Sequence, residues 1–197
     1  MKNKLINIIL ILFLLNGCVG ASSKGIFGTG VSVALDPRTV GTQIDDGIID
    51  KNLDAKLLLM NKNYLLSIST QVLDGRIFIT GKVEDTEEKL KITKLAWEIE
   101  GARSVKNDLK IKEKFSFKQS AKDILITSQL RTALIFNKKI KSANYSIDTY
   151  KKKIYIYGIA ESKEEQLLVI EEAKQILDVE DVISSILLVE DLRIQKN

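Results

Sequence analysis

The chain has 197 residues, of which 45% are hydrophobic and 28% charged, and its formal net charge is +4. This balance supports packed cores and argues against extensive disorder. With no histidine and a single cysteine, the sequence lacks the residue types that build most zinc sites, Ser-His-Asp triads and internal disulfides.

The first seventeen residues have the order of a secretory signal peptide. Two lysines precede an apolar run at 5–15, which is too short to cross a bilayer core of about 30 Å as a helix. A leucine three places before Cys18 and a glycine directly before it resemble the lipobox of bacterial lipoproteins. The resemblance implies cleavage before Cys18 and lipidation of that residue, a stable anchor; the alternative is a short buried helix with a chance cysteine. Val19, in place of aspartate, favours the outer membrane by the same resemblance.

The segment after the cysteine has the composition of a linker. From Gly20 to Ala34 the side chains are mostly small and, except for Lys24, uncharged. Such a composition is typical of a flexible tether. We therefore expect a lipidated tether over residues 18–41.

The remaining sequence contains an internal repeat at a constant offset of 77 residues, from Asp46 to Asp123. The gapless register also pairs Ile49 with Ile126, Leu53 with Leu130, Leu57 with Leu134, Gly81 with Gly158 and Val105 with Val182. This match predicts two tandem domains of one fold, copy one at 42–113 and copy two at 119–190.

Each copy begins with a predicted amphipathic helix. In copy one, Ile49, Leu53 and Leu57 lie at helical spacing and form the expected core face. Thr42, with Asp45 three residues later, is the expected N-terminal cap of this helix, because its hydroxyl can accept a free backbone amide.

Two strands, a helix and a strand follow. Alternating stretches at 68–72 and 77–83 predict a hairpin that turns at Asp74-Gly75, whereas Lys151-Lys152 leaves the turn geometry of copy two open. A second helix is expected at about 86–100 and a last strand at about 104–111. This αββαβ order implies an α+β fold with two helices on one side of a three-stranded sheet. The small size of each copy favours packing between them.

The second strand and the turn before the last strand carry a motif. Copy one has Asp74, Gly75, Ile77, Ile79, Gly81, Val83, Gly101 and Val105, and copy two keeps Ile154, Ile156, Gly158 and Val182 but has Asp178 at the last glycine position. The pattern resembles the BON domain. A lipobox followed by two such copies is similar to dual BON-domain outer-membrane lipoproteins. The segment 36–47, which leads into the first helix of copy one, resembles the corresponding segment of those proteins. The resemblance implies a lipid-anchored protein of the outer membrane that faces the periplasm and supports envelope integrity, with the outer-membrane assembly machinery as a further possible partner.

Charge is distributed unevenly between and within the copies. Copy one is near neutral, whereas residues 112–153 hold 11 basic and 3 acidic side chains and the rest of copy two is acidic. Several cations on one face favour attachment to anionic headgroups; the alternative is that these lysines only keep the surface soluble.

The first helix of copy two is the expected lipid-binding element. Leu125 and Phe136 share a line away from the core face, beside lysines, which suits a membrane interface or burial against copy one. The resemblance implies binding of anionic phospholipid, such as phosphatidylglycerol or cardiolipin, through this helix, with Leu125 and Ile135 at inserting positions and Arg131 matched. The expected site comprises Leu125, Arg131, Ile135, Phe136, Lys138 and Lys139.

Other functions are less well supported. Glu87-Glu88 and Glu164-Glu165 lie in the first turns of the expected second helices, where their charges complement the helix dipole. We therefore expect no enzyme, cofactor or metal site. Export makes nucleic acid an unlikely partner. Trp97, without a counterpart in copy two, is expected in a core or between domains. The alternative function is a periplasmic scaffold or stress chaperone in which the BON domains bind envelope proteins.

Overall fold

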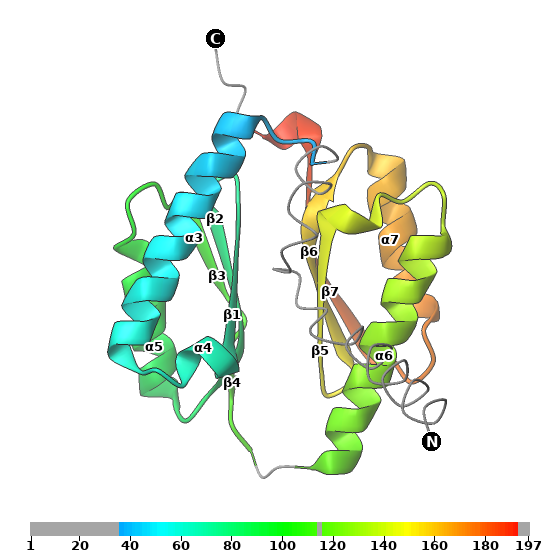
Figure 1. Cartoon of the computed structure of the whole chain (residues 1–197). Coiled ribbons are helices and arrows are strands. Elements are labelled where there is room, and N and C mark those ends of the chain that lie inside the picture. Colours follow the sequence, from blue (N-terminus) through cyan, green and yellow to red (C-terminus); the bar gives the residue numbers. More distant parts are fainter. Residues whose placement is uncertain (1–35, 114–115, 193–197) are drawn as a thin grey trace, which may run out of the picture. The chain divides into compact units, whose positions relative to one another are not determined.

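The computed structural model describes residues 36–113 and 116–192 (Figure 1). The expected signal peptide, Cys18 and most of the tether lie outside these residues. Within the described ranges, no helix combines the length and the hydropathy needed to cross a bilayer.

Copy one contains the expected elements and one additional short helix. They are α3 (Val40–Met60), α4 (Tyr64–Ser67), β1 (Ile68–Leu73), β2 (Arg76–Val83), α5 (Thr86–Trp97), β3 (Ser104–Asn107) and β4 (Lys110–Ile111). β1 pairs antiparallel with β2, and β3 and β4 both pair parallel with β2. The expected last strand is therefore divided in two, because the Asn107 side chain accepts the amide of Leu109 at 2.9 Å and interrupts the ladder.

Copy two repeats this order. Its elements are α6 (Phe117–Phe136), η2 (Ser142–Asn144), β5 (Tyr145–Tyr150), β6 (Lys153–Ala160), α7 (Lys163–Gln175), β7 (Asp181–Leu188) and η3 (Val189–Asp191). β6 lies between an antiparallel β5 and a parallel β7. The predicted α+β fold, with two tandem αββαβ units, is confirmed.

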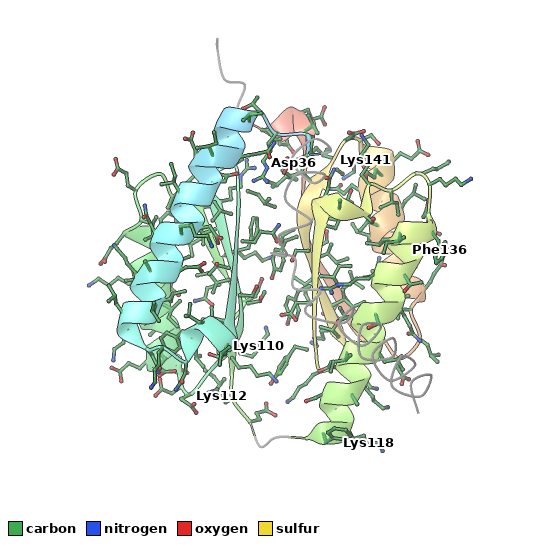
Figure 2. All side chains as sticks on the ribbon, in the orientation of Figure 1. Asp36, Lys110, Lys112, Lys118, Phe136 and Lys141 are labelled. Carbon is green, nitrogen blue, oxygen red and sulfur yellow. The ribbon has the colours of Figure 1, made fainter. Side chains whose placement is uncertain are left out.

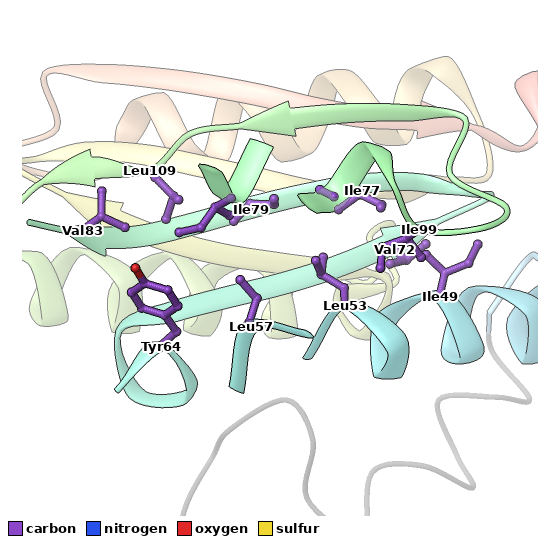
Figure 3. Packing of buried hydrophobic residues seen from close by; sticks show 12 residues of the cluster. Ile49, Leu53, Leu57, Tyr64, Val72, Ile77, Ile79, Val83, Ile99 and Leu109 are labelled. Carbon is purple, nitrogen blue, oxygen red and sulfur yellow. The ribbon is translucent and has the colours of Figure 1, made fainter. Parts of the chain in front are cut away.

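Each copy has a core between its helices and its sheet. In copy one, Ile49, Leu53 and Leu57 of α3 pack toward Ile77 and Ile79 of β2 (Figure 3). The equivalent residues of copy two form a separate cluster. Full burial of one such side chain stabilises the fold by about 1.5–3 kcal/mol, so the repeated apolar positions account for the helix-to-sheet packing in both copies.

A buried carboxylate of the first helix holds the hairpin turn in each copy. Asp123 accepts the amides of Lys151 and Lys152, both at 2.9 Å, and Asp46 accepts those of residues 74–75, both at 2.7 Å. Lys151 and Lys152 have φ of 49° and 62°, in the left-handed region that the Asp-Gly turn of copy one also occupies. The geometry left open by the sequence is therefore the same in both copies.

The start of α3 differs from the expectation. The helix begins at Val40, two residues before the expected boundary, and its cap is Thr39, whose hydroxyl accepts the amide of Thr42 at 3.2 Å. The prediction of Thr42 as the cap was wrong. Arg38 fixes the earlier start, because its guanidinium pairs with Asp46 at 2.6 Å and donates to a β1 carbonyl.

A third apolar cluster combines side chains of both sheets. Leu73 and Phe78 of copy one lie with Tyr155, Tyr157 and Ile159 of copy two, and the rings of Phe78 and Tyr157 are 5.0 Å apart. This confirms packing between the copies. All members of the three clusters lie between 36 and 192, so residues 36–197 retain every core contact described here.

Trp97 does not occupy a core. It ends α5 and 53% of its surface is exposed. The expectation was a place in a core or between the domains; Trp97 belongs neither to the core of copy one nor to the apolar cluster that combines the two sheets.

Candidate functional site

The candidate site is built on α6. Its inner face buries Ile126, Leu130 and Leu134 against the sheet of copy two. The hydroxyl of Ser116 caps its N-terminus, and Asn137 at its end donates to Glu172 of α7 at 2.8 Å. Both ends and the inner face are therefore held, and the orientation of the outer face follows from them.

The outer face of α6 carries an uncharged strip, which we call the outer strip. Successive helical residues are about 100° apart, and from residue 121 to the end of the helix this places seven exposed residues within an arc of about 120°. They are Ala121, Ile124, Leu125, Ser128, Thr132, Ile135 and Phe136. The large side chains are 57% exposed at Leu125, 67% at Ile135, 68% at Ile124 and 79% at Phe136.

The hydroxyl groups of the outer strip are satisfied by the helix itself. Ser128 donates to the carbonyl of Ile124 and Thr132 donates to that of Ser128, each at 2.9 Å. A hydroxyl bonded back to its own helix does not need a water partner. The strip can therefore face acyl chains without exposing an unpaired polar hydrogen.

Cations surround the outer strip. Lys122 and Arg131 lie on its two edges, Lys118 at its N-terminal end, and Lys138 and Lys139 in the turn that follows Phe136; Figure 2 labels Lys118 and Phe136, which mark the two ends of the helix. The one acidic residue of α6 is Asp123, which is buried at the turn of the hairpin. The face thus combines an apolar centre with a positive rim.

The rim cations are held loosely. Lys122 lies 3.4 Å from Asp178, and Lys139 lies 3.3 Å from Glu164 with both side chains 71% exposed. Arg131 donates to the carbonyl of Ile147 at 3.3 Å. Exposed ion pairs of this kind contribute little stability, so these cations can exchange their partners for phosphate groups.

A shallow cleft of about 400 Å³ lies along the Arg131 edge. Ser120, Thr127 and Ser128 line it with hydroxyl groups, and Asp123, Asp148 and Lys82 line it with charged groups. Because it holds two carboxylates beside Arg131, the cleft suits the hydroxyl groups of a headgroup better than its phosphate.

All six residues expected at the site lie on α6 or in the turn after it. Leu125, Arg131, Ile135 and Phe136 are exposed on the helix, and the two lysines follow it. Sequence reasoning missed Ile124. Ile124 and Ile135 are eleven residues apart, about three helical turns, which is the same spacing that singled out Leu125 and Phe136.

The paired glutamates are occupied by structural bonds. The carboxylate of Glu88 accepts the amide of Glu84, and that of Glu165 accepts the amides of Glu161 and Lys141, all at 2.8 Å. Burial first, and then the charge of Glu165, raises the pKa of Tyr145 above its ordinary value. Among residues 36–113 and 116–192, no group of three or more Asp, Glu, His or Cys side chains is arranged to hold a metal ion.

Two αββαβ units, each with a buried carboxylate holding a hairpin turn, define a tandem-repeat α+β protein. Residues 45–113 and 122–190 both match the model of the BON domain. The chain therefore belongs to the BON domain family, and its expected resemblance to dual BON-domain outer-membrane lipoproteins is confirmed.

Three relatives share most of the repeat region. A protein of Anaplasma centrale named "Uncharacterized protein in gshII 5'region" is 32% identical over 142 residues, which are 72% of this chain and 93% of that protein. The outer membrane lipoprotein DolP of Haemophilus influenzae is 29% identical over 148 residues, covering 73% of this chain and 75% of DolP. The 21 kDa hemolysin of Actinobacillus pleuropneumoniae is 23% identical over 63% of this chain and 64% of its own length.

Proposed function

We propose that this chain is a lipid-anchored protein of the outer membrane that faces the periplasm, binds anionic phospholipid through α6, and supports envelope integrity without catalysing a reaction. The observation that carries the proposal is the outer strip, which exposes four large apolar side chains and has five cations around it, two of them in exposed ion pairs with Asp178 and Glu164. Similarity to DolP supports the envelope location. The anchor, Cys18, is inferred from the lipobox pattern.

The energetics of the face suit an anionic bilayer. An interfacial helix gains affinity from the apolar area that it buries and from attraction to anionic lipids. Each lysine or arginine near an anionic surface contributes about 1 kcal/mol, and α6 with the turn after it presents five, including Arg131 and Lys138. Phosphatidylglycerol and cardiolipin are therefore the expected ligands, whereas zwitterionic lipid offers the apolar term alone.

Co-sedimentation with vesicles tests the proposal. Soluble residues 36–197, which keep all core contacts and lack the anchor, are mixed with phosphatidylglycerol, cardiolipin or phosphatidylcholine vesicles. Leu125→Glu with Ile135→Glu is expected to lower the affinity for anionic vesicles by about tenfold or more, because two inserting side chains become anions. The matched control is Leu90→Glu with Leu167→Glu, on equally exposed positions of α5 and α7.

Equal binding by the α6 variant and the parent protein would contradict the role of α6. The absence of any vesicle binding by the parent would favour the alternative function, a scaffold or chaperone that binds envelope proteins. The outer-membrane assembly machinery would then be the first partner to test.

A further inference from the structure

Copy one has an exposed apolar corner where α3 ends and α4 begins. Its five large side chains are Leu58, Leu59, Met60, Leu65 and Leu66, which we call the apolar corner. Leu66 is 93% exposed and Leu59 is 86% exposed, the two highest values among the large hydrophobic side chains that the structure describes. Contiguous exposed apolar side chains of this kind mark interaction sites in soluble domains.

The apolar corner is held in place by the core beneath it. Leu57 and Tyr64, on either side of the turn, are buried in the core of copy one. The amide of Asn61 donates to the carbonyl of Leu57 at 3.0 Å, and the amide of Tyr64 donates to the carbonyl of Asn61 at 2.9 Å. The fold of copy one therefore fixes the segment that carries Leu59 and Leu66, and both side chains are exposed as a result.

The charge around the apolar corner is positive. Residues 55–68 contain Lys56 and Lys62 and no acidic residue. Leu66 also lines a cleft of about 330 Å³ with three lysines and two aspartates, which are Lys82, Lys110, Lys112, Asp108 and Asp148.

Acidic side chains of copy one on both sides of the corner in the chain have partners already. Asp54 pairs with Lys51 at 3.2 Å, and Asp74 pairs with Arg103. Glu84 pairs with Lys112 at 2.5 Å. Glu88 accepts the amide of Glu84 at 2.8 Å. The charge that the corner presents to a partner is therefore that of its lysines.

The corner occupies the same place in copy one as the end of the outer strip in copy two. At the repeat offset, Leu58 and Leu59 correspond to Ile135 and Phe136, and Lys62 corresponds to Lys139. Both copies thus end the first helix with two exposed apolar side chains followed by a lysine. Copy one extends this arrangement through α4, whose Leu65 and Leu66 correspond to a serine and an alanine in copy two.

We propose that the apolar corner is a second phospholipid-binding site, located in copy one and separate from α6. Leu59 and Leu66 insert among the acyl chains, and Lys56 and Lys62 reach the headgroup phosphates. Lysine can do so because its long stem lies along apolar surface while the ammonium remains in the polar layer. A bilayer suits this surface because two highly exposed leucines, Lys56 and Lys62 beside them, and the lack of an acidic residue between positions 55 and 68 match its apolar interior and anionic surface.

Tryptophan fluorescence can report the corner and α6 separately. Trp97 is the sole tryptophan of the chain, so Trp97→Phe leaves a silent background in residues 36–197. Leu66→Trp then reports the corner, Leu125→Trp reports α6, and Leu90→Trp on α5 is the control, since Leu90 is 64% exposed. Each variant is mixed with phosphatidylglycerol vesicles whose acyl chains carry bromine, which quenches tryptophan that enters the apolar layer.

The expected result is quenching at position 66 within about twofold of that at position 125, as for two interfacial elements at similar depth, with little at position 90. Leu59→Glu with Leu66→Glu, made without tryptophan reporters, is expected to lower vesicle affinity by about tenfold. Leu90→Glu, which adds one negative charge on α5, is its control and should change the affinity by less than about twofold.

Other outcomes overturn one proposal or the other. Quenching at position 125 without quenching at position 66 overturns the corner and leaves α6 intact. Quenching at position 66 alone overturns α6 and supports the corner. If sedimentation equilibrium shows a dimer that Leu59→Glu dissociates, and position 66 is not quenched, the corner is an interface between copies of the chain and the inference is wrong.

Discussion

The first helices of the two copies have the same inner face and opposite outer edges. α3 and α6 each bury three aliphatic residues at equivalent positions and one carboxylate, Asp46 or Asp123, at the hairpin turn. At the two edges of the outer face, however, Asp45 corresponds to Lys122 and Asp54 corresponds to Arg131. The repeat therefore keeps what the fold requires and inverts the charge that a partner meets.

The centre of the outer face differs as well. Lys51 of α3 occupies the position of Ser128, and Gly47 occupies that of Ile124. The acidic side chains on the edges repel an anionic bilayer, and neither Lys51 nor Gly47 supplies an apolar side chain for insertion, so the body of α3 is a poor surface for such a bilayer. The comparison explains why a lipid contact in copy one is expected beyond Asp54, at the apolar corner, and not along the helix.

The shared inner faces of α3 and α6 can be tested at their buried carboxylates, Asp46 and Asp123. Asp46→Ala is expected to lower the free energy of unfolding by about 3–4 kcal/mol, because it removes two buried turn bonds and one of the two carboxylates that pair with Arg38, which keeps Asp36. Asp123→Ala removes two turn bonds and a bond from Gln119 and should cost about 2–3 kcal/mol. Urea unfolding of residues 36–197 measures both. Equal losses of unfolding free energy in the two variants would show that the pair between Arg38 and Asp46 does not stabilise copy one.

The difference between the outer faces of α3 and α6 can be tested by exchanging the charges on their edges. Lys122→Asp with Arg131→Asp gives α6 the edges of α3 and is expected to weaken binding to phosphatidylglycerol vesicles by about thirtyfold or more, since two cations worth about 1 kcal/mol each become anions. Lys163→Asp with Lys174→Asp makes the same change in net charge on α7 and is the control. A similar loss in both variants would mean that net charge, and not the rim of α6, determines binding.

Much of this comparison could be predicted from the sequence. The core faces follow from helical spacing, because Ile49, Leu53 and Leu57 can share one side of a helix only, and the Asp-Gly pair predicts the hairpin turn. Helix ends were less certain. Thr39 and Thr42 can both cap a helix, and Arg38 decides between them through a contact with β1 that is distant in the chain.

Exposure was harder to predict than burial. Ile124 and Leu125 are adjacent apolar residues on a helix, and whether neighbouring elements cover either of them depends on the tertiary structure. The apolar corner was missed for the same reason. Leu58 to Met60 continue the core stripe in sequence, and only the fold of α4 shows that they point outward along with Leu65 and Leu66.

Ile124 is a further difference between the two outer faces, since α3 has Gly47 at that position. Its contribution to vesicle binding can be measured separately. Ile124→Ala is expected to weaken vesicle binding by about fivefold, because three carbons leave a side chain that is partly inserted. Leu167→Ala, on the exposed side of α7, should leave binding unchanged. Isothermal titration with phosphatidylglycerol vesicles measures the difference. An unchanged affinity would restrict the inserting line to Leu125 and Phe136.

The smallest expected effect concerns the two hairpin turns. Lys152 has φ of 62°, a conformation that costs an ordinary residue about 1 kcal/mol and glycine little. Lys152→Gly should therefore stabilise copy two by about 0.5–1 kcal/mol in urea unfolding, although it removes an exposed pair with Glu180. The reverse change is not tolerated equally, because a Cβ at Gly75 would lie 2.9 Å from the carbonyl of Gly101. Gly75→Ala should therefore destabilise copy one by more than Lys152→Gly stabilises copy two. If the two changes in the free energy of unfolding were equal in size and opposite in sign, the difference between the turns would lie in backbone conformation alone and not in this close approach.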